Sequence, residues 1–225
     1  MKFDWRVELP QILVVAFLFA LAAWAWGLAP DRVPVHWNLH GQVDRMGGKA
    51  EGLLIGPCVA LGIYLLMLFI PRLDPGRANY AHFLGSWHGL RLMLLAVVAV
   101  IQVAVVTALL GHRVDMSRLM PLLLGVMWVV LGSFLGKLRP NWFFGVRTPW
   151  TLSSKDSWVK THRVAGFGFV GVGLVWILSS FLGRAWVFVG CFILLFAMIL
   201  GVVVYSYLVW KRDPDKSPPA GTLPA

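Results

Sequence analysis

Six long runs that contain no Lys, Arg, Asp, Glu or His divide this chain, and no other feature limits its fold as strongly. An α-helix rises about 1.5 Å per residue, so roughly 20 apolar residues cross the ~30 Å hydrocarbon layer of a bilayer. We therefore expect an all-α fold, a polytopic membrane helix bundle with six transmembrane helices. The predicted spans are Ile12–Ala29, Gly52–Ile70, Leu92–Gly111, Leu119–Gly136, Val164–Gly183 and Ala185–Trp210.

The composition favours lipid, and not water, as the solvent of these helices. Hydrophobic residues make up 59% of the 225 residues and charged residues only 13%, about half of the roughly 25% that is usual in soluble domains. The net charge of +10 does not indicate nucleic acid, because the basic residues lie between apolar runs and no nucleic-acid motif accompanies them. We expect the lipid bilayer as a partner and no direct contact with nucleic acid.

The Lys and Arg residues that flank the spans predict the orientation. Fourteen of them lie in the N-terminal segment, the second and fourth loops and the C-terminal tail, with Arg91 counted in the second loop. Only six lie in the first, third and fifth loops. Because cytoplasmic loops carry the excess of positive charge, the sequence predicts that both termini are cytoplasmic.

The first loop, residues 30–51, is then extracytoplasmic, and it is predicted to be extended before it turns. Proline restricts the residue before it to extended backbone, and turns are expected at Gly41 and at the Gly47–Gly48 pair. In an extended chain His36 and Asn38 face the same way, and Asp44 returns to hydrogen-bond one of them. Either the polar groups of this loop hydrogen-bond one another and the loop is a lid, or the loop is an outer binding site.

His36, His40 and Asp44 are also weak candidates for metal ligands. Histidines four residues apart converge only on a helix, whereas extended backbone at about 3.3 Å per residue separates them by some 13 Å. No HExxH motif or set of cysteine ligands accompanies them. The sequence therefore predicts no bound metal.

Glycine spacing within the spans predicts close approach between helices. The fifth run contains a GxGxxG string at Gly166, Gly168 and Gly171. A dinucleotide-binding string follows a strand and opens a helix, whereas this one lies inside an apolar run of membrane length. We interpret it as a packing feature and expect no cofactor.

The fourth loop, residues 137–163, is the most distinctive polar segment. Four aromatic residues fall within ten positions, which predicts that the loop docks at the membrane interface or on helix ends. Ser153, with Asp156 three residues later, resembles a capping box. A helix is therefore expected to begin there and to carry Trp158, His162 and Arg163 into the fifth span.

Arg147 is the candidate binding residue of this loop, because Gly145 and the Thr148–Pro149 pair restrict the backbone on either side of it. A guanidinium held in this way binds a lipid phosphate, a carboxylate or a partner protein. The alternative is a membrane-anchoring loop whose arginine meets lipid headgroups.

Both loops resemble segments of a known family. The string Asn141-Trp-Phe-Phe-Gly-Val-Arg-Thr-Pro-Trp-Thr-Leu-Ser153, followed by Trp158 and Lys160-Thr-His-Arg163, resembles the signature of the SdpI family. The string from Val33 to Asp44, with Gly47, resembles the small domain of unknown function that commonly precedes that signature. One departure is Lys155-Asp156, where acidic residues are expected at both positions.

The resemblance implies a multi-pass protein of the bacterial cell (inner) membrane. The best-known relatives confer immunity to a secreted toxic peptide, and they transduce a signal by sequestering a cytoplasmic repressor at the membrane. The implied partners are a peptide toxin outside and a cytoplasmic regulator inside. The implied inner binding residues are Asn141, Phe144, Gly145, Arg147, Thr148, Pro149, Trp150, Trp158, His162 and Arg163, and the implied outer ones are His36, Asn38 and Asp44.

Three units are expected: residues 1–80, with two helices and loop 30–51; residues 81–213, an SdpI-like unit of four helices with loop 137–163; and a disordered tail, residues 214–225. The expected activity is binding and not catalysis. One alternative is a transporter or channel for a small or peptide substrate, although the span centres offer only neutral groups such as Gln102. The other is a metal-dependent hydrolase that uses the outer histidines.

Overall fold

The computed structural model describes residues 4–217, and six of its helices are long and apolar enough to cross a membrane. This confirms the predicted polytopic helix bundle. The six are α1 (Trp5–Trp26), α2 (Lys49–Leu73), α3 (Leu84–Leu109), α4 (Met116–Leu135), α6 (Lys155–Ser180) and α7 (Ala185–Arg212). The shorter elements are the strands β1 (Arg32–Trp37) and β2 (Val43–Gly48), the 3-10 helix η1 (Arg77–His82) and the helix α5 (Pro149–Leu152).

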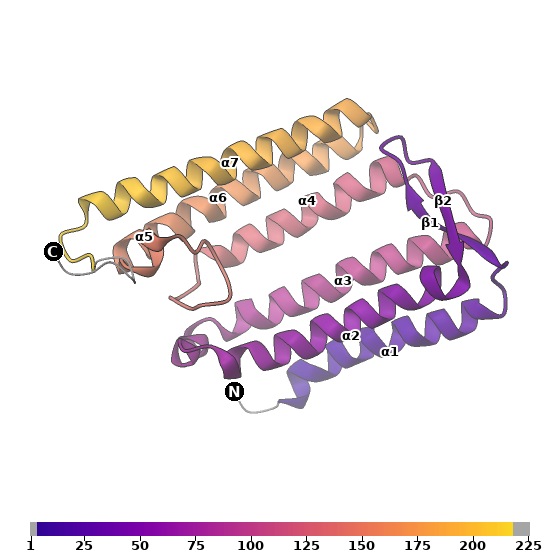
Figure 1. Ribbon diagram of the computed structural model, residues 1–225, viewed down its shortest axis with the longest axis horizontal. Helices are drawn as coiled ribbons and strands as arrows, with labels where there is room; N and C mark the ends of the chain where they lie inside the picture. The colour runs from indigo at the N-terminus through magenta and orange to yellow at the C-terminus, as the bar shows by residue number, and fades with distance from the viewer. Residues whose placement is uncertain (1–3, 218–225) are drawn as a thin grey trace.

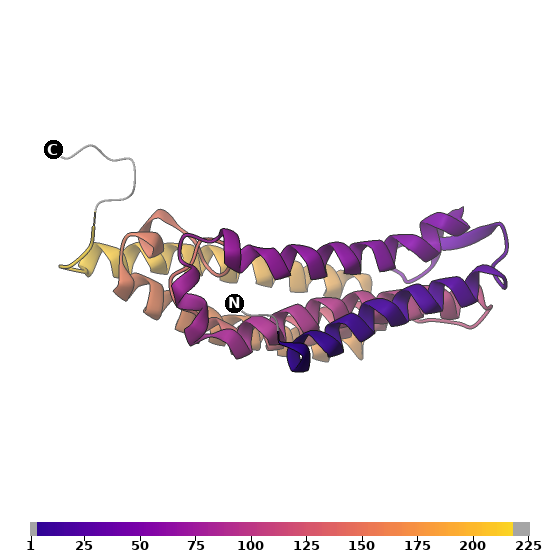
Figure 2. The ribbon, with the colours of Figure 1, turned by 90° about the horizontal axis from the view of Figure 1, so that it is seen from below.

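The long helices lie along the longest axis of the molecule (Figures 1 and 2). Helices α1, α2 and α3 pack against one another, α6 packs against both α4 and α7, and α3 meets α4 between the two groups. The strands lie at one end of the bundle and α5 at the other (Figure 1), and we name these the hairpin end and the α5 end. Helix α1 begins and α7 ends at the α5 end.

The extended backbone predicted for the first loop is confirmed, and it pairs into an antiparallel hairpin in which Trp37 lies opposite Val43. The chain reverses at Gly41, whose φ of 74° is a left-handed value that glycine adopts without strain. Gly47 stays within β2 and Gly48 is the N-cap of α2. The second predicted turn is therefore the junction between strand and helix.

Facing glycines bring the backbones of α4 and α6 together. A Cβ on Gly132 would lie 2.6 Å from the carbonyl oxygen of Gly166, and a Cβ on Gly125 would lie 2.8 Å from that of Gly173. On each helix the two glycines are two turns apart, so they share one face. Small residues at such positions allow transmembrane helices to meet closely. Gly166 of the GxGxxG string is thus a packing residue, as predicted.

Five helices begin earlier than their apolar runs, because polar turns precede the hydrocarbon segment. The starts of α1, α3 and α6 are seven to nine residues earlier, and those of α2 and α4 are three residues earlier. The Asp4 side chain caps α1 by accepting the N–H of Arg6, and the Ser154 side chain caps α6 by accepting the N–H of Ser157. The expectation that Ser153 caps this helix is wrong, because Ser153 ends α5 and its hydroxyl donates to the carbonyl of Pro149.

Helix packing places α3 with α1 and α2. The expected division of the chain between residues 80 and 81 stays a prediction, because packing alone does not delimit a domain. Most of the predicted disordered tail, residues 218–225, lies outside the described residues.

Candidate functional site

The α5 end is built around a buried carboxylate, Asp74, which directly follows α2. Its Oδ2 accepts a hydrogen bond from the Tyr80 hydroxyl at 2.9 Å and from the backbone N–H of Trp142 at 3.0 Å. Its Oδ1 accepts from the N–H of Gly76 at 2.6 Å. Burial, together with the hydrogen bond to Asp74, raises the pKa of Tyr80, so this hydroxyl stays a donor. The loop between α2 and α3 therefore holds in place the loop between α4 and α5, residues 136–148, which we name the signature loop.

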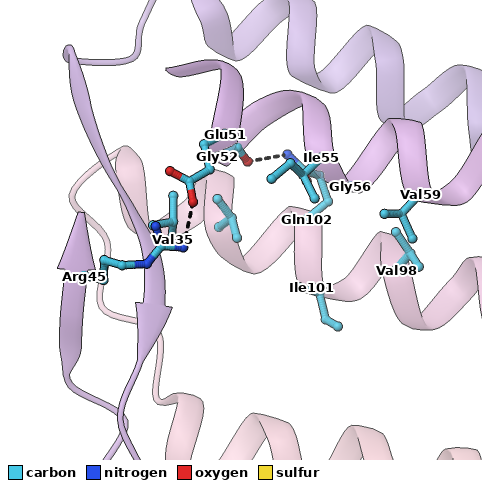
Figure 3. Close-up of a pocket in the computed structure, with 11 residues that line it drawn as sticks. Val35, Arg45, Glu51, Gly52, Ile55, Gly56, Val59, Val98, Ile101 and Gln102 are labelled. Carbon is cyan, nitrogen blue, oxygen red and sulfur yellow. Dashed lines mark hydrogen bonds and ion pairs between the residues drawn. The ribbon is translucent and has the colours of Figure 1, made fainter. Parts of the chain in front are cut away.

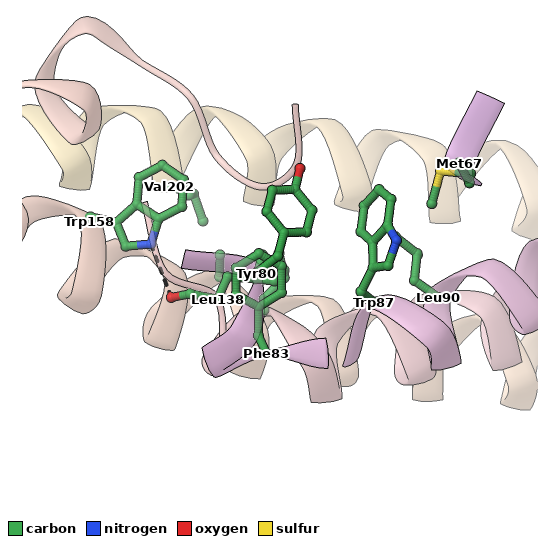
Figure 4. Close-up of a cluster of buried hydrophobic side chains, with 10 residues drawn as sticks. Met67, Tyr80, Phe83, Trp87, Leu90, Leu138, Trp158 and Val202 are labelled. Carbon is green, nitrogen blue, oxygen red and sulfur yellow. Dashed lines mark hydrogen bonds between the residues drawn. The ribbon is translucent and has the colours of Figure 1, made fainter. Parts of the chain in front are cut away.

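Aromatic side chains fill the space beside these polar contacts (Figure 4). The rings of Tyr80 and Trp87 meet edge to face with centroids 5.2 Å apart, and Trp87 meets Phe144 in the same manner at 6.3 Å. Edge-to-face pairs of this kind stabilise a packed aromatic cluster. Phe144 thereby anchors the signature loop on α3.

Asn141 shapes the first half of the signature loop. It is 2% exposed, and its Oδ1 accepts from the backbone N–H groups of Phe143 and Phe144. Its Nδ2 donates to the carbonyls of Arg139 and Phe144. An asparagine that hydrogen-bonds its own neighbourhood in this way fixes a turn.

His162, buried on α6, fixes the second half of the loop. Its Nε2 accepts from the N–H of Val146 at 2.9 Å, and its Nδ1 donates to the carbonyl of Trp158 at 2.8 Å. An imidazole that both accepts and donates is in its neutral form. The rings of His162 and Trp158 stack with centroids 4.1 Å apart. Gly145 leaves the necessary room, because a Cβ at that position would overlap Nε2 of His162.

Hydroxyl groups connect α5 and the start of α6 to the end of α7. Thr148 forms a capping box with Thr151 at the start of α5, and its Oγ1 lies 3.0 Å from Oγ of Ser206 on α7. Ser154 donates to Oδ2 of Asp213, just after α7, at 2.5 Å. This hydrogen bond lowers the pKa of Asp213 below its ordinary value of 3.8.

Three of the exposed side chains at the α5 end are a cation and two aromatic rings. Arg147 is exposed and donates from Nη1 to the carbonyl of Trp142. Trp142 and Phe143 are 52% and 41% exposed. A cavity of about 810 Å³ opens beside Arg147 and Trp142, and its lining carries two positive charges, Arg147 and Lys155, and one negative charge, Asp215. This surface suits an anionic headgroup or an acidic partner segment with apolar flanks.

The residues implied by the resemblance at this end therefore differ in accessibility. Asn141, Thr148, Trp158 and His162 are buried; Phe144, Gly145 and Trp150 are half-buried; Arg147, Pro149 and Arg163 are exposed. Only the exposed group is free to meet a partner without rearrangement.

At the hairpin end, His36 and Asp44 meet as predicted, with 2.5 Å between Nδ1 and Oδ1. Asn38 does not share their face, because it lies beyond β1 and its Oδ1 accepts from the backbone N–H groups of His40 and Gln42. Within residues 4–217, no three His, Cys, Asp or Glu side chains gather as a metal site would require. Of the three outer residues, Asn38 thus shapes the turn, and the His36–Asp44 pair is the exposed polar feature.

An ion pair buried between α1 and α3 was missed by the sequence analysis. Arg91 donates from Nη1 and Nη2 to the two carboxylate oxygens of Glu8 at 2.9 and 2.7 Å, and the two side chains are 1% and 4% exposed. The expectation that Arg91 is a loop charge is wrong, because α3 begins eight residues before its apolar run and α1 begins seven residues before its own, so that Glu8 and Arg91 both lie in helices but outside the apolar runs. His88 and Tyr64 flank Arg91.

Comparison with known proteins matches both polar segments. Residues 137–209, from the signature loop into α7, match the SdpI/YfhL protein family, and residues 13–61, from α1 through the hairpin into α2, match a domain of unknown function, DUF1648. The chain contains an SdpI-family region. The resemblance inferred from the two loops is confirmed.

One relative extends this likeness to most of the chain. The Immunity protein SdpI of Bacillus subtilis (strain 168) is 24% identical over 204 residues, which make up 90% of this chain and 95% of that protein. No solved structure matches the chain. With its six apolar helices, the chain is a multi-pass membrane protein homologous to an immunity protein.

Two residues that hold the SdpI-family loop, Asp74 and Tyr80, lie between the two matched segments. A signal for Asp74 exists in the sequence, because Asp74-Pro-Gly comes shortly after the apolar run that ends at Ile70, and an aspartate at such a turn accepts the N–H two residues later. The partner Trp142, however, lies 68 residues away, and no local pattern specifies it.

Proposed function

We propose that this protein binds a membrane-active peptide toxin at its hairpin end and thereby protects the cell that makes it. The observation that carries the proposal is the similarity to an immunity protein over 90% of the chain. The proposed location is the inner membrane of a bacterium, with the α5 end in the cytoplasm, as the excess of Lys and Arg near that end predicts. The proposed activity is binding and not catalysis.

The α5 end is the proposed contact for a cytoplasmic regulator. Arg147 lies beside two exposed rings, Trp142 and Phe143. Arginine and tryptophan are the side chains that most often dominate the energy of protein interfaces. The surrounding loop is held by Asp74 and His162, so this surface is formed before a partner binds and little ordering is needed on association.

A strain that lacks the protein tests the protective role. Parent, deletion and complemented strains are exposed to the membrane-active peptides that the strain and its neighbours secrete, and survival is counted. We expect the deletion strain to die at peptide concentrations that the other two tolerate. Equal survival of the three strains against every peptide contradicts the proposal.

A pull-down from native membranes tests the regulator contact. The parent protein is compared with Arg147→Ala and with Arg77→Ala, which removes an exposed arginine of η1 that lies outside the lining of the cavity beside Arg147 and outside the implied binding residues. We expect a partner that the parent and Arg77→Ala retain and that Arg147→Ala loses. A partner lost equally from both variants would indicate an unspecific charge effect and not the proposed surface.

A transporter is the second candidate, and the Glu8–Arg91 pair is the observation that favours it. Ionisable residues inside membrane helices commonly mark the route of a transported ion or substrate. A cavity of about 500 Å³ at the α5 end is lined by Glu8 and His88. Proteoliposomes that show a substrate-dependent current, abolished by Glu8→Gln, would support this candidate. Absence of flux for both ions and peptides would contradict the transporter hypothesis.

A further inference from the structure

A cavity of about 270 Å³ lies between α2 and α3 beside the hairpin (Figure 3). Most of its wall is apolar. The apolar lining residues are Ile55 and Val59 of α2, Val98, Ile101 and Val105 of α3, and Val35 of β1. The cavity thus offers space for an aliphatic group at the end of the bundle where the proposed toxin contact lies.

Gln102 contributes an amide to the lining, and this amide hydrogen-bonds two backbone carbonyls of α2. Pro57 has no N–H, so the carbonyl of Leu53, four residues earlier in α2, lacks its usual helical donor. Nε2 of Gln102, on α3, donates to this carbonyl and to that of Gly52, each at 3.3 Å. A Cβ at Gly56 would overlap the amide of Gln102, so glycine is required there.

The carbonyl half of the same amide has no partner. Gln102 is 3% exposed and lines the cavity. Within residues 4–217 its Oε1 accepts no hydrogen bond, and it is not one of the fully enclosed atoms that lack a partner. An acceptor that is accessible from a mostly apolar cavity is available to a ligand N–H or O–H. The acyl chains and esters of a phospholipid have no such donor, whereas a peptide backbone has one at nearly every residue.

An ion pair forms the hairpin side of the cavity. Nη2 of Arg45 on β2 lies 2.6 Å from Oε1 of Glu51 on α2, and their side chains are 57% and 34% exposed. A peptide group can meet both, because its N–H donates to a carboxylate and its carbonyl accepts from a guanidinium. The charged side of the cavity therefore suits a peptide group, as Oε1 of Gln102 does.

We propose that this cavity holds an apolar peptide segment: one aliphatic side chain enters between α2 and α3, and a backbone N–H of the segment donates to Oε1 of Gln102. The inference rests on the proposed function and names the part of the toxin that is recognised. The proposed site requires both the hairpin and the helices that pack beside it, since Arg45 comes from β2 and Gln102 from α3.

The test uses the full-length protein in nanodiscs of phosphatidylethanolamine and phosphatidylglycerol. One probe is acetyl-Leu-Leu-Leu-amide with a fluorophore on its C-terminal amide, and the second is the same peptide with every backbone nitrogen methylated, which keeps the side chains and removes the donors. We expect saturable binding of the first and about tenfold weaker binding of the second, as the loss of one buried hydrogen bond predicts. Equal affinities, or no saturable binding of either probe, would overturn the inference.

Matched variants locate the binding. Val98→Phe fills the cavity, and Val103→Phe adds the same volume on α3 at a residue that is 42% exposed and outside the cavity lining. We expect Val98→Phe to lose saturable binding and Val103→Phe to bind as the parent does. Should Val98→Phe fail to fold, Gln102→Met removes the acceptor and is expected to bind the two probes with equal affinity. A Gln102→Met variant that still prefers the unmethylated probe contradicts the assignment.

Three further outcomes distinguish this inference from lipid binding and from the proposed function. A phospholipid that co-purifies with the parent but not with Val98→Phe, without peptide binding, would make lipid the occupant and the inference wrong. In the survival assay, full protection by Val98→Phe would show that the cavity is not the toxin site and would not contradict the immunity role. Conversely, the protein could bind the tripeptide although its deletion sensitises no strain. That result would contradict the immunity role and not the assignment of the cavity.

Discussion

Gly145 has a φ of 112°, which L side chains rarely adopt, and it lies against the imidazole of His162. Gly145→Ala would strain the backbone and overlap Nε2 of His162, so we expect the free energy of unfolding to fall by about 1–3 kcal/mol. Thermal unfolding in detergent measures the change. The control is Gly171→Ala on α6, where a Cβ has no neighbour within 4 Å. Unchanged melting of Gly145→Ala would contradict this account of the loop.

The contact between Ser154 and Asp213 predicts a pH dependence. Its hydrogen bond lowers the pKa of Asp213 below 3.8 in the folded protein, so folding favours the ionised carboxylate. The stabilisation is complete above the ordinary pKa and is lost as the pH falls through the lowered one. We expect Asp213→Asn to melt below the parent at neutral pH, and this difference to disappear under strongly acidic conditions. A difference that stays constant with pH would exclude the carboxylate as its cause.

The Glu8–Arg91 pair predicts strongly unequal effects of single and double substitutions. Removing one partner leaves an uncompensated buried charge, which destabilises a protein by about 3–5 kcal/mol. We expect Arg91→Met to cause a loss of this order and Glu8→Met/Arg91→Met to recover most of it. Unfolding free energies of the four proteins in the double-mutant cycle provide the measurement. Additive losses would show that the two side chains act independently.

Among the elements, the contact between α4 and α6 depends on the absence of side chains. Gly132→Ala places a methyl group 2.6 Å from the carbonyl oxygen of Gly166, so the helices must separate. We expect a loss of about 1–3 kcal/mol, as is typical of overpacking. Gly201→Ala on α7, where a Cβ meets nothing within 4 Å, is the matched control. Similar melting of the two variants would mean that α4 and α6 adjust without strain.

The elements that the sequence predicted well are those specified by local patterns. Hydropathy located six spans, and Gly41 located the hairpin turn, because both signals lie within a few neighbouring residues. Contacts between distant residues were not predictable in this way. Glu8 and Arg91 are 83 positions apart, Asp74 and Trp142 are 68 apart, and Gln102 and Gly52 are 50 apart. Hydropathy also missed the polar first turns of α1 and α3, because caps and buried ion pairs extend helices beyond their apolar residues. The early start of α6 was predicted from the local capping pattern near Ser153 and Asp156.

For the whole molecule, the decisive question is which end of the bundle faces the cytoplasm. Six helices are long and apolar enough to cross a membrane, and α1 begins and α7 ends at the same end of the bundle, together with α5 and its basic loop (Figure 1). Correcting the place of Arg91 leaves the excess of Lys and Arg at this end. The positive-inside rule therefore predicts that the α5 end faces the cytoplasm and the hairpin the outside. A toxin contact at the hairpin and a regulator contact at Arg147 both require this orientation.

Labelling with a membrane-impermeant maleimide tests the orientation. In a Cys58→Ala/Cys191→Ala background, single cysteines replace His40 at the hairpin turn and Lys155 at the start of α6, both of which are exposed. We expect intact spheroplasts to label His40→Cys alone and permeabilised ones to label both. If intact spheroplasts label Lys155→Cys alone, the bundle has the opposite orientation and Arg147 lies outside. If intact spheroplasts label both variants, the six-span topology is wrong, because two ends separated by the hydrocarbon layer cannot share one aqueous compartment.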